Sequence, residues 1–184
     1  MALTDSNMIP LGSEAPPFTL LDVITDKEVK LEDIQSNVAT VVMFICNHCP
    51  YVKHIQPELV RLSEDYIPEG IKFIAISSND VENYPEDSPE LMKEEAKKWG
   101  YAFPYLYDET QAVARAYDAA CTPDFYIFDD HMKLIYRGQL DNSRPGNGKE
   151  LDGADIRNAL DDYLKGNPIT DHQIPSQGCN IKWK

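Results

Sequence analysis

Residues 38–50 read VATVVMFICNHCP, and this stretch decides the fold. Its first part is almost wholly apolar, as expected for a strand that is buried on both faces. Apolar residues then recur at helical spacing, which predicts an amphipathic helix over 50–66. Residues 71–77 predict a second buried strand. The sequence therefore predicts a β-α-β unit with Cys46 at the junction between the first strand and the helix.

Patterns on either side of this unit predict the remaining elements. Ser88 and Gly100 can cap a helix between them, and polar turns join the strands of two predicted hairpins. The expected strands outside the unit cover 18–21, 29–31, 124–128 and 134–139, and the expected helices cover 89–99, 109–118 and 156–164. This order predicts one α/β domain over 13–166, with a central mixed β-sheet flanked by helices and an N-terminal β-hairpin. A loose arm at 1–12 and a C-terminal tail at 167–184 that packs on the domain complete the chain.

Composition narrows the class of protein. The chain has 184 residues with 31 acidic and 17 basic side chains, which gives a formal net charge of −14. This surplus argues against nucleic acid or an anionic membrane surface as partners. Residues 1–17 show no secretory signal, and no apolar run is long enough to cross a bilayer. We therefore expect a cytoplasmic protein, in which four cysteines are catalytic, metal-binding or unbridged rather than structural disulfides.

Cys46 and Cys49 form a CxxC motif at the predicted junction of strand and helix. Two cysteines at this spacing can share one face of a first helical turn and close a small disulfide. The unpaired N–H groups and the positive dipole end of the helix favour a thiolate on Cys46. We expect Cys46 to be the exposed nucleophile and Cys49 to be the resolving thiol that attacks the mixed disulfide. No cofactor besides this redox-active disulfide is expected.

His48 lies between the two cysteines, and two interpretations stay open. A protonated imidazole would stabilise the thiolate further. Strongly oxidising bacterial disulfide oxidases have a similar CxHC arrangement, which indicates a raised potential. Alternatively, His48 is an exposed residue at the start of the helix.

A second signal is Thr122-Pro123, directly before a predicted buried strand. Here the chain resembles the thioredoxin superfamily, whose members place a cis-proline opposite the CxxC motif. This resemblance implies a thioredoxin-like fold, a cis bond at Pro123 and a substrate backbone paired with Thr122. Thr40 stands where thioredoxins carry a buried aspartate, so the usual proton acceptor is absent or replaced.

Residues 12–20, GSEAPPFTL, together with Cys49-Pro50, resemble the peroxiredoxin or AhpC/TSA branch of that superfamily. In combination with the CTP segment 121–123 and the tail segment GCNIKW at 178–183, they are similar to its CxxC-containing peroxiredoxin-like group. The resemblance implies a thiol-disulfide oxidoreductase with an antioxidant or peroxide-linked role. Its partners would be a protein disulfide or a peroxide, and a thiol reductant. The sequence leaves the oligomeric state open.

Two other functions remain as alternatives. In a peroxiredoxin-type hydroperoxide reductase the roles reverse: Cys49, followed by Pro50, forms the sulfenic acid, and Cys46 condenses with it. A different class of function is a non-catalytic redox sensor or a copper or zinc chaperone. Soft ligands lie close together in sequence at Cys46, His48, Cys49 and His54. Because these side chains cannot easily converge on one tetrahedral ion, we expect no resident metal.

Two hypotheses concern residues outside the motif. The topology brings the loop around Arg144 to the same end of the sheet as Pro123. Arg144 then either supplies positive charge to the site or is a solvated loop residue. Cys121 is next to Thr122, and Cys179 in the tail either folds back to pair with it or packs as a separate buried thiol.

Overall fold

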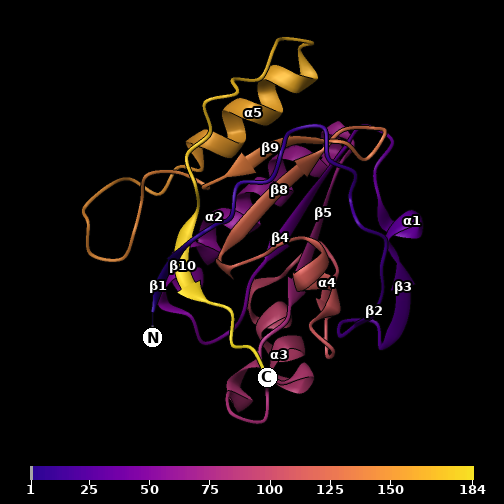
Figure 1. Cartoon of the computed structure of the whole chain (residues 1–184), viewed down its shortest axis with the longest axis vertical. Coiled ribbons are helices and arrows are strands. Elements are labelled where there is room, and N and C mark those ends of the chain that lie inside the picture. Colours follow the sequence, from indigo (N-terminus) through magenta and orange to yellow (C-terminus); the bar gives the residue numbers. More distant parts are fainter. Residues whose placement is uncertain (1) are drawn as a thin grey trace.

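The computed structural model describes residues 2–184, which form two β-sheets (Figure 1). The larger sheet has the strand order β3-β2-β6-β5-β4-β8-β9, and the smaller has the order β1-β10-β7. The strands are β1 (Leu3–Asp5), β2 (Thr19–Asp22), β3 (Lys27–Lys30), β4 (Ala39–Phe44), β5 (Ile71–Ser77), β6 (Tyr105–Tyr107), β7 (Cys121–Thr122), β8 (Asp124–Phe128), β9 (Leu134–Gly138) and β10 (Gln177–Asn180). The helices are α1 (Leu31–Ile34), α2 (Pro50–Tyr66), α3 (Pro89–Trp99), α4 (Ala112–Ala116) and α5 (Ala154–Leu164), with short 3-10 helices η1 (Ile67–Glu69) and η2 (Pro85–Asp87).

The apolar stretch at 38–45 contains β4, which lies inside the larger sheet between β5 and β8. All six residues of β4 are buried. β4 pairs in parallel with β5 and antiparallel with β8, so the sheet is mixed and the predicted α/β fold class is confirmed. The β4-α2-β5 unit places the CNHC segment 46–49 just beyond the C-terminal end of β4.

Alternate residues of β4 point to opposite faces of the sheet and join two separate apolar cores. Val41 and Met43 belong to the core that α2, α3 and α5 cover. Val42 and Phe44 belong to the core that α4 and the N-terminal hairpin cover. Helices therefore protect both faces of β4, which explains its continuous apolar sequence.

The N-terminal arm was predicted to be loose, but part of it forms a paired strand. Leu3–Asp5 form β1, which pairs antiparallel with β10 and places Leu3 opposite Cys179. β10 in turn pairs with β7, so both ends of the chain meet in the small sheet (Figure 1). This contact joins residues more than a hundred positions apart. A strand of three residues is too short to show a hydrophobic period, so the sequence could not predict β1.

Other elements differ from expectation mainly in length. Only the middle of 109–118 is helical, as α4, and Gln111 before it has a positive φ of 64°. β6 was not predicted, because three residues give no clear period. Helix α3 has the expected caps: the Leu91 N–H donates to Ser88 Oγ at 3.4 Å, and Gly100 has a φ of 68°.

Along residues 2–184, no helix combines the length and the apolar character that spanning a membrane requires.

Candidate active site

The two cysteines of the CxxC motif lie just before α2 rather than on its first turn. β4 ends at Phe44 and α2 begins at Pro50, which makes Cys49 the N-cap residue and leaves Cys46 in the preceding turn. Proline is favoured at the first helical position because its missing N–H needs no partner there. Cys46 is only 1% exposed and Cys49 is 0% exposed. The prediction that Cys46 is exposed is therefore wrong.

The Thr122-Pro123 peptide lies against the dithiol, and it is cis as predicted. Thr122 Oγ1 is 3.5 Å from Cys46 Sγ, and the Thr122 carbonyl oxygen is 3.4 Å from Cys49 Sγ. One residue thus contacts both sulfurs. However, Thr122 does not present an open backbone to a substrate, because β10 pairs with it and places Cys179 opposite. The chain's own C-terminal strand occupies the edge that was expected to bind substrate.

Cys49 is the cysteine whose ionisation the site favours. Its sulfur accepts hydrogen bonds from the thiols of Cys179 and Cys46 and from the backbone N–H of Val52. These hydrogen bonds, foremost that from Cys179, hold the pKa of Cys49 well below its usual value of about 8.5, although burial opposes ionisation. The positive end of the α2 dipole acts in the same direction.

Cys46, by contrast, is held as a thiol. Burial raises the pKa of Cys46 well above its usual value, and its hydrogen bond to Cys49 and the nearby charge of Asp87 raise it further. The expectation of a thiolate on Cys46 assumed a helix that begins at Cys46, whereas the helix N-terminus that stabilises a thiolate starts after Cys49. The position of the helix N-terminus therefore favours ionisation of Cys49 over that of Cys46.

A buried carboxylate that the sequence did not single out fixes the turn between the cysteines. Asp87 Oδ1 accepts hydrogen bonds from the backbone N–H groups of Asn47 at 2.8 Å and His48 at 3.2 Å. Its Oδ2 accepts one from Asn79 Nδ2 at 2.8 Å. Burial opposes ionisation of Asp87, but the hydrogen bonds from His48 and Asn79 hold its pKa below the usual range. Asp87 is therefore a buried anion that lies beside the dithiol.

The side chain of His48 pairs with the Asp87 carboxylate. Its Nδ1 lies 2.5 Å from Asp87 Oδ2, and its ring stacks on that of Tyr84 with a centroid distance of 5.3 Å. The hydrogen bond to Asp87 raises the pKa of His48, and the negative charge of Cys49 raises it further. The His48 side chain is 14% exposed, so it is not merely a solvated residue at the helix start. The contacts favour the other interpretation, an imidazolium close to a thiolate.

No local pattern could have identified Asp87. It follows an acidic loop and precedes the Ser88 helix cap, where an aspartate is unremarkable. Its contact with Asn47 spans 40 residues and forms only when η2 folds against the end of β4. The one available signal was Thr40, which stands where thioredoxins carry a buried aspartate. Its presence indicated that another residue could take the role of that carboxylate.

Cys179 lies at the dithiol, whereas Cys121 does not. In the β10–β7 register Cys179 is opposite Thr122 and Asn180 is opposite Cys121. Successive residues of a strand point to opposite faces, so the Cys121 and Cys179 side chains lie on different sides of the small sheet. Cys121 Sγ instead lies 3.6 Å from the Pro123 carbonyl oxygen. The hypothesis that Cys121 and Cys179 pair is therefore wrong.

Arg144 borders a small cavity with Pro123 but does not direct its charge to the sulfurs. Its Nη1 donates to the carbonyl oxygens of Asp141 at 2.7 Å and Ser143 at 2.8 Å. Its Nη2 donates to Gln139 Oε1 at 2.6 Å. Arg144 therefore braces its own loop, and neither the proposed catalytic role nor a freely solvated side chain describes it.

Potential metal ligands occur in Cys46, His48 and Asp87, whose ligand atoms lie within 4.8 Å of one another. Both oxygens of Asp87 already accept hydrogen bonds, and one of them is paired with His48 Nδ1. His54 is not part of this group, since its Nε2 lies 2.7 Å from Ser143 Oγ. A metal ion would have to replace the hydrogen bonds that fix the CNHC turn, so we assign these residues to dithiol chemistry.

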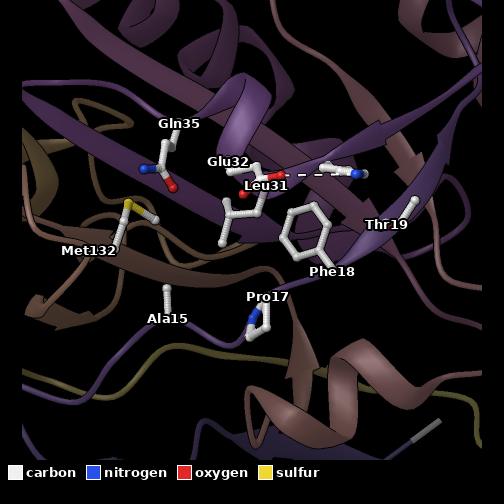
Figure 2. A pocket seen from close by; sticks show the side chains of 9 residues that line it. Ala15, Pro17, Phe18, Thr19, Leu31, Glu32, Gln35 and Met132 are labelled. Atoms are coloured by element: carbon white, nitrogen blue, oxygen red, sulfur yellow. Dashed lines mark ion pairs between the residues drawn. The ribbon is translucent and has the colours of Figure 1, made fainter.

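A separate pocket of about 490 Å³ lies between the start of β2 and α1 (Figure 2). Phe18, Leu31 and Met132 line it, and Lys30 Nζ and Glu32 Oε1 form an ion pair at 4.0 Å beside it. Its lining residues include neither the CNHC segment nor Thr122-Pro123. The pocket is therefore distinct from the cysteine site.

Residues 11–137 match the sequence model of the AhpC/TSA family. The chain belongs to this family. It is similar to an uncharacterized conserved protein from Geobacillus kaustophilus, with 64% identity and a TM-score of 0.98 over 100% of this chain and 97% of that one. A hypothetical protein from Sinorhizobium meliloti 1021 is 46% identical with a TM-score of 0.95, covering 98% of each chain.

More distant similarity agrees with the fold. The thiol-disulfide oxidoreductase ResA from Halalkalibacterium halodurans is 22% identical over 132 residues, which cover 71% of this chain and 69% of ResA. The thioredoxin domain of a thiol-disulfide oxidoreductase from Bacteroides vulgatus is 18% identical with a TM-score of 0.66, covering 85% of this chain and 99% of that domain. The fold of this AhpC/TSA-family chain is therefore thioredoxin-like, as the sequence resemblance implied.

Proposed function

We propose that this protein is a thiol-disulfide oxidoreductase in which Cys49 is the reactive thiolate and Cys46 is its resolving partner. The observation that carries the proposal is the pair of hydrogen-bonded sulfurs at the start of α2, both in contact with Thr122 of the cis Thr122-Pro123 peptide. The similarity to ResA, which is named a thiol-disulfide oxidoreductase, supports the same class of reaction.

The order of steps follows from the lowered pKa of Cys49 and the raised pKa of Cys46. The Cys49 thiolate attacks one sulfur of a substrate disulfide, that S–S bond breaks, and the leaving sulfur takes up a proton. Cys46 then loses its proton and attacks Cys49 Sγ, which releases the second substrate thiol. The products are a Cys46–Cys49 disulfide and a reduced substrate, and a thiol reductant restores the dithiol.

The second step needs a base for Cys46, whose pKa is raised. The nearest candidates are His48 and Asp87, whose polar atoms lie within 4.8 Å of Cys46 Sγ. Above its raised pKa, His48 is a neutral imidazole that would accept the proton and become imidazolium, and the Asp87 carboxylate would balance its charge. The raised pKa of His48 makes it a stronger base than an ordinary histidine. We propose that this pair replaces the aspartate that is absent at Thr40.

Burial of the dithiol favours a second candidate, the reduction of hydroperoxides. Cys46 is 1% exposed and Cys49 is 0% exposed, so a peroxide could reach them with a smaller movement than a protein substrate requires. The Cys49 thiolate would cleave the O–O bond to give a sulfenic acid and water or an alcohol. Cys46 would then condense with the sulfenic acid to form the same disulfide and release water. An antioxidant role would follow from this second scheme.

Assays on two substrates separate the schemes. Insulin reduction and hydrogen peroxide consumption are measured with a thiol reductant for the wild type, Cys46→Ser/Cys179→Ser and Cys49→Ser. Disulfide exchange predicts insulin reduction by the wild type and a trapped mixed disulfide on Cys49 in the double variant Cys46→Ser/Cys179→Ser, in which neither neighbouring thiol can release it. Peroxide reduction predicts peroxide consumption that Cys49→Ser abolishes. If Cys49→Ser changes neither rate, the proposal is wrong. Cys121→Ser, outside the sulfur cluster, is the control.

A further inference from the structure

Cys179 is directly opposite the residue that contacts both sulfurs of the dithiol. In the antiparallel register of β10 and β7, Cys179 pairs with Thr122. Paired residues project their side chains to the same face of a sheet. Since the Thr122 hydroxyl lies 3.5 Å from Cys46 Sγ, the Cys179 side chain also faces the dithiol. Cys46, Cys49 and Cys179 belong to one buried cluster.

Hydrogen bonds connect Cys179 directly to the proposed nucleophile. The thiol and the backbone N–H of Cys179 both bond to the Cys49 sulfur. The backbone N–H of Tyr51 bonds to the Cys179 sulfur. β10 accordingly runs beside α2, although the two elements lie more than a hundred residues apart in sequence (Figure 1). Cys49 therefore has two thiol neighbours, Cys46 and Cys179.

The backbone around Cys179 is fitted to this position. A β-carbon on Gly178 would overlap the Thr122 carbonyl oxygen and lie 2.7 Å from its carbonyl carbon, so only glycine permits this approach. On the N-terminal side, Ser176 Oγ donates to the Pro123 carbonyl oxygen at 2.7 Å. β10 thus binds the cis-proline loop as an added strand, in the manner of a peptide that pairs with a sheet edge.

We propose that Cys179 is a third redox-active thiol of this centre and that the disulfide moves between Cys46–Cys49 and Cys49–Cys179. This inference rests on the proposed function. Starting from the Cys46–Cys49 disulfide, Cys179 loses its proton and its sulfur attacks Cys49 Sγ. The bond between Cys46 and Cys49 breaks, and its electron pair leaves on Cys46, which takes up the proton. One disulfide forms for each one broken, so no external oxidant or reductant is consumed.

The exchange has a consequence for the fold. A Cys49–Cys179 disulfide ties the C-terminal strand covalently to the start of α2 and returns Cys46 to the thiol form. The C-terminal strand then acts as an intramolecular substrate that occupies the substrate edge at Thr122. Its cysteine lies where the sulfur of an incoming protein disulfide would have to lie.

Disulfide mapping tests this inference. The reduced wild type and the variants Cys46→Ser, Cys46→Ser/Cys179→Ser and Cys46→Ser/Cys121→Ser are treated with one equivalent of diamide, a two-electron thiol oxidant. Samples are quenched in acid, digested with pepsin and mapped by mass spectrometry without reduction. We expect a peptide cross-linked through Cys49 and Cys179 in most molecules of Cys46→Ser. The Cys121→Ser double variant should retain this cross-link, and the Cys179→Ser double variant should lose it.

Two outcomes separate this inference from the proposed function. If the wild type forms the Cys46–Cys49 disulfide while Cys46→Ser gives only reduced thiols or intermolecular dimers, the role of Cys179 is overturned and the proposed function stands. If neither protein forms an intramolecular disulfide, both proposals are overturned. In the wild type, a Cys49–Cys179 cross-link beside the Cys46–Cys49 disulfide would support the exchange without any substitution.

Discussion

Gly178 lies so close to Thr122 that a β-carbon on it would overlap the Thr122 carbonyl oxygen. Gly178→Ala should therefore separate β10 from the cis-proline loop and uncover Cys46 and Cys49. Overpacking of this kind costs about 1–3 kcal/mol, which corresponds to a roughly 5- to 150-fold increase in local opening. We expect iodoacetamide to modify the dithiol of the reduced, folded variant faster by a similar factor.

The control for this substitution is Gly146→Ala. A β-carbon on Gly146 meets nothing within 4 Å, although its φ of 76° makes alanine unfavourable there. This variant therefore tests for general destabilisation without a clash at the site. Equal modification rates in the wild type and Gly178→Ala would show that β10 does not cover the dithiol.

The thiolate should belong to Cys49. In the reduced protein, the thiolate absorbance at 240 nm should persist well below pH 8.5, the approximate pKa of an ordinary cysteine. Cys49→Ser should lose this absorbance at neutral pH. Cys179→Ala removes the foremost hydrogen bond to Cys49 and should raise the pKa of Cys49 by about one unit or more. If the absorbance at 240 nm persists in Cys49→Ser and disappears in Cys46→Ser, the thiolate belongs to Cys46 and the prediction is wrong.

The His48–Asp87 pair should stabilise the fold in a defined pH window. The pKa of His48 is raised, so its contribution is complete below the unfolded value of about 6.5 and is lost as pH rises through the folded pKa. The pKa of Asp87 is lowered, so its contribution is complete above about 3.9 and is lost as pH falls through the folded pKa. The pair should therefore contribute most between about pH 4 and 6.5, by roughly 1–3 kcal/mol.

Urea unfolding of the wild type and His48→Asn from pH 5 to pH 8 measures this contribution. The difference in unfolding free energy should be largest at pH 5 and shrink as the pH rises above about 6.5. A difference that stays constant over this range would mean that His48 acts through packing on Tyr84 rather than through its charge.

Breaking a buried ion pair outside the site should strongly destabilise the fold. Asp124 and Arg137 are both fully buried, and Arg137 Nη2 donates to Asp124 Oδ2 at 2.8 Å. Arg137→Met leaves the carboxylate buried without its partner and should cost about 3–5 kcal/mol in chemical denaturation. Lys133→Met removes a solvent-exposed pair with Glu14 and should change the unfolding free energy far less. Similar losses in both variants would contradict this assignment.

Much of the fold was predictable because its signals are local. The apolar run of β4, the helical spacing of α2 and the capping residues of α3 each lie within one segment. The cis-proline and the family were predictable from short motifs. β1, β6 and β10 were missed because they are strands of three or four residues that gain stability only from their partners.

The site was predictable in its residues but not in their roles. Cys46, Cys49 and Thr122 come together as expected. The choice of thiolate depends on whether α2 starts before or after Cys49, and periodicity does not fix this boundary. Asp87 and Cys179 reach the dithiol only through tertiary contacts across about 40 and 130 residues.

A redox titration of the wild-type protein tests the dithiol most directly. The protein is equilibrated in glutathione buffers of graded potential, quenched in acid and analysed by mass spectrometry for each cysteine. We predict a single two-electron transition that converts the Cys46 and Cys49 thiols into a disulfide, with a midpoint between about −270 mV and about −120 mV. Cys46 and Cys49 that remain thiols in the most oxidising buffer would contradict a redox-active pair.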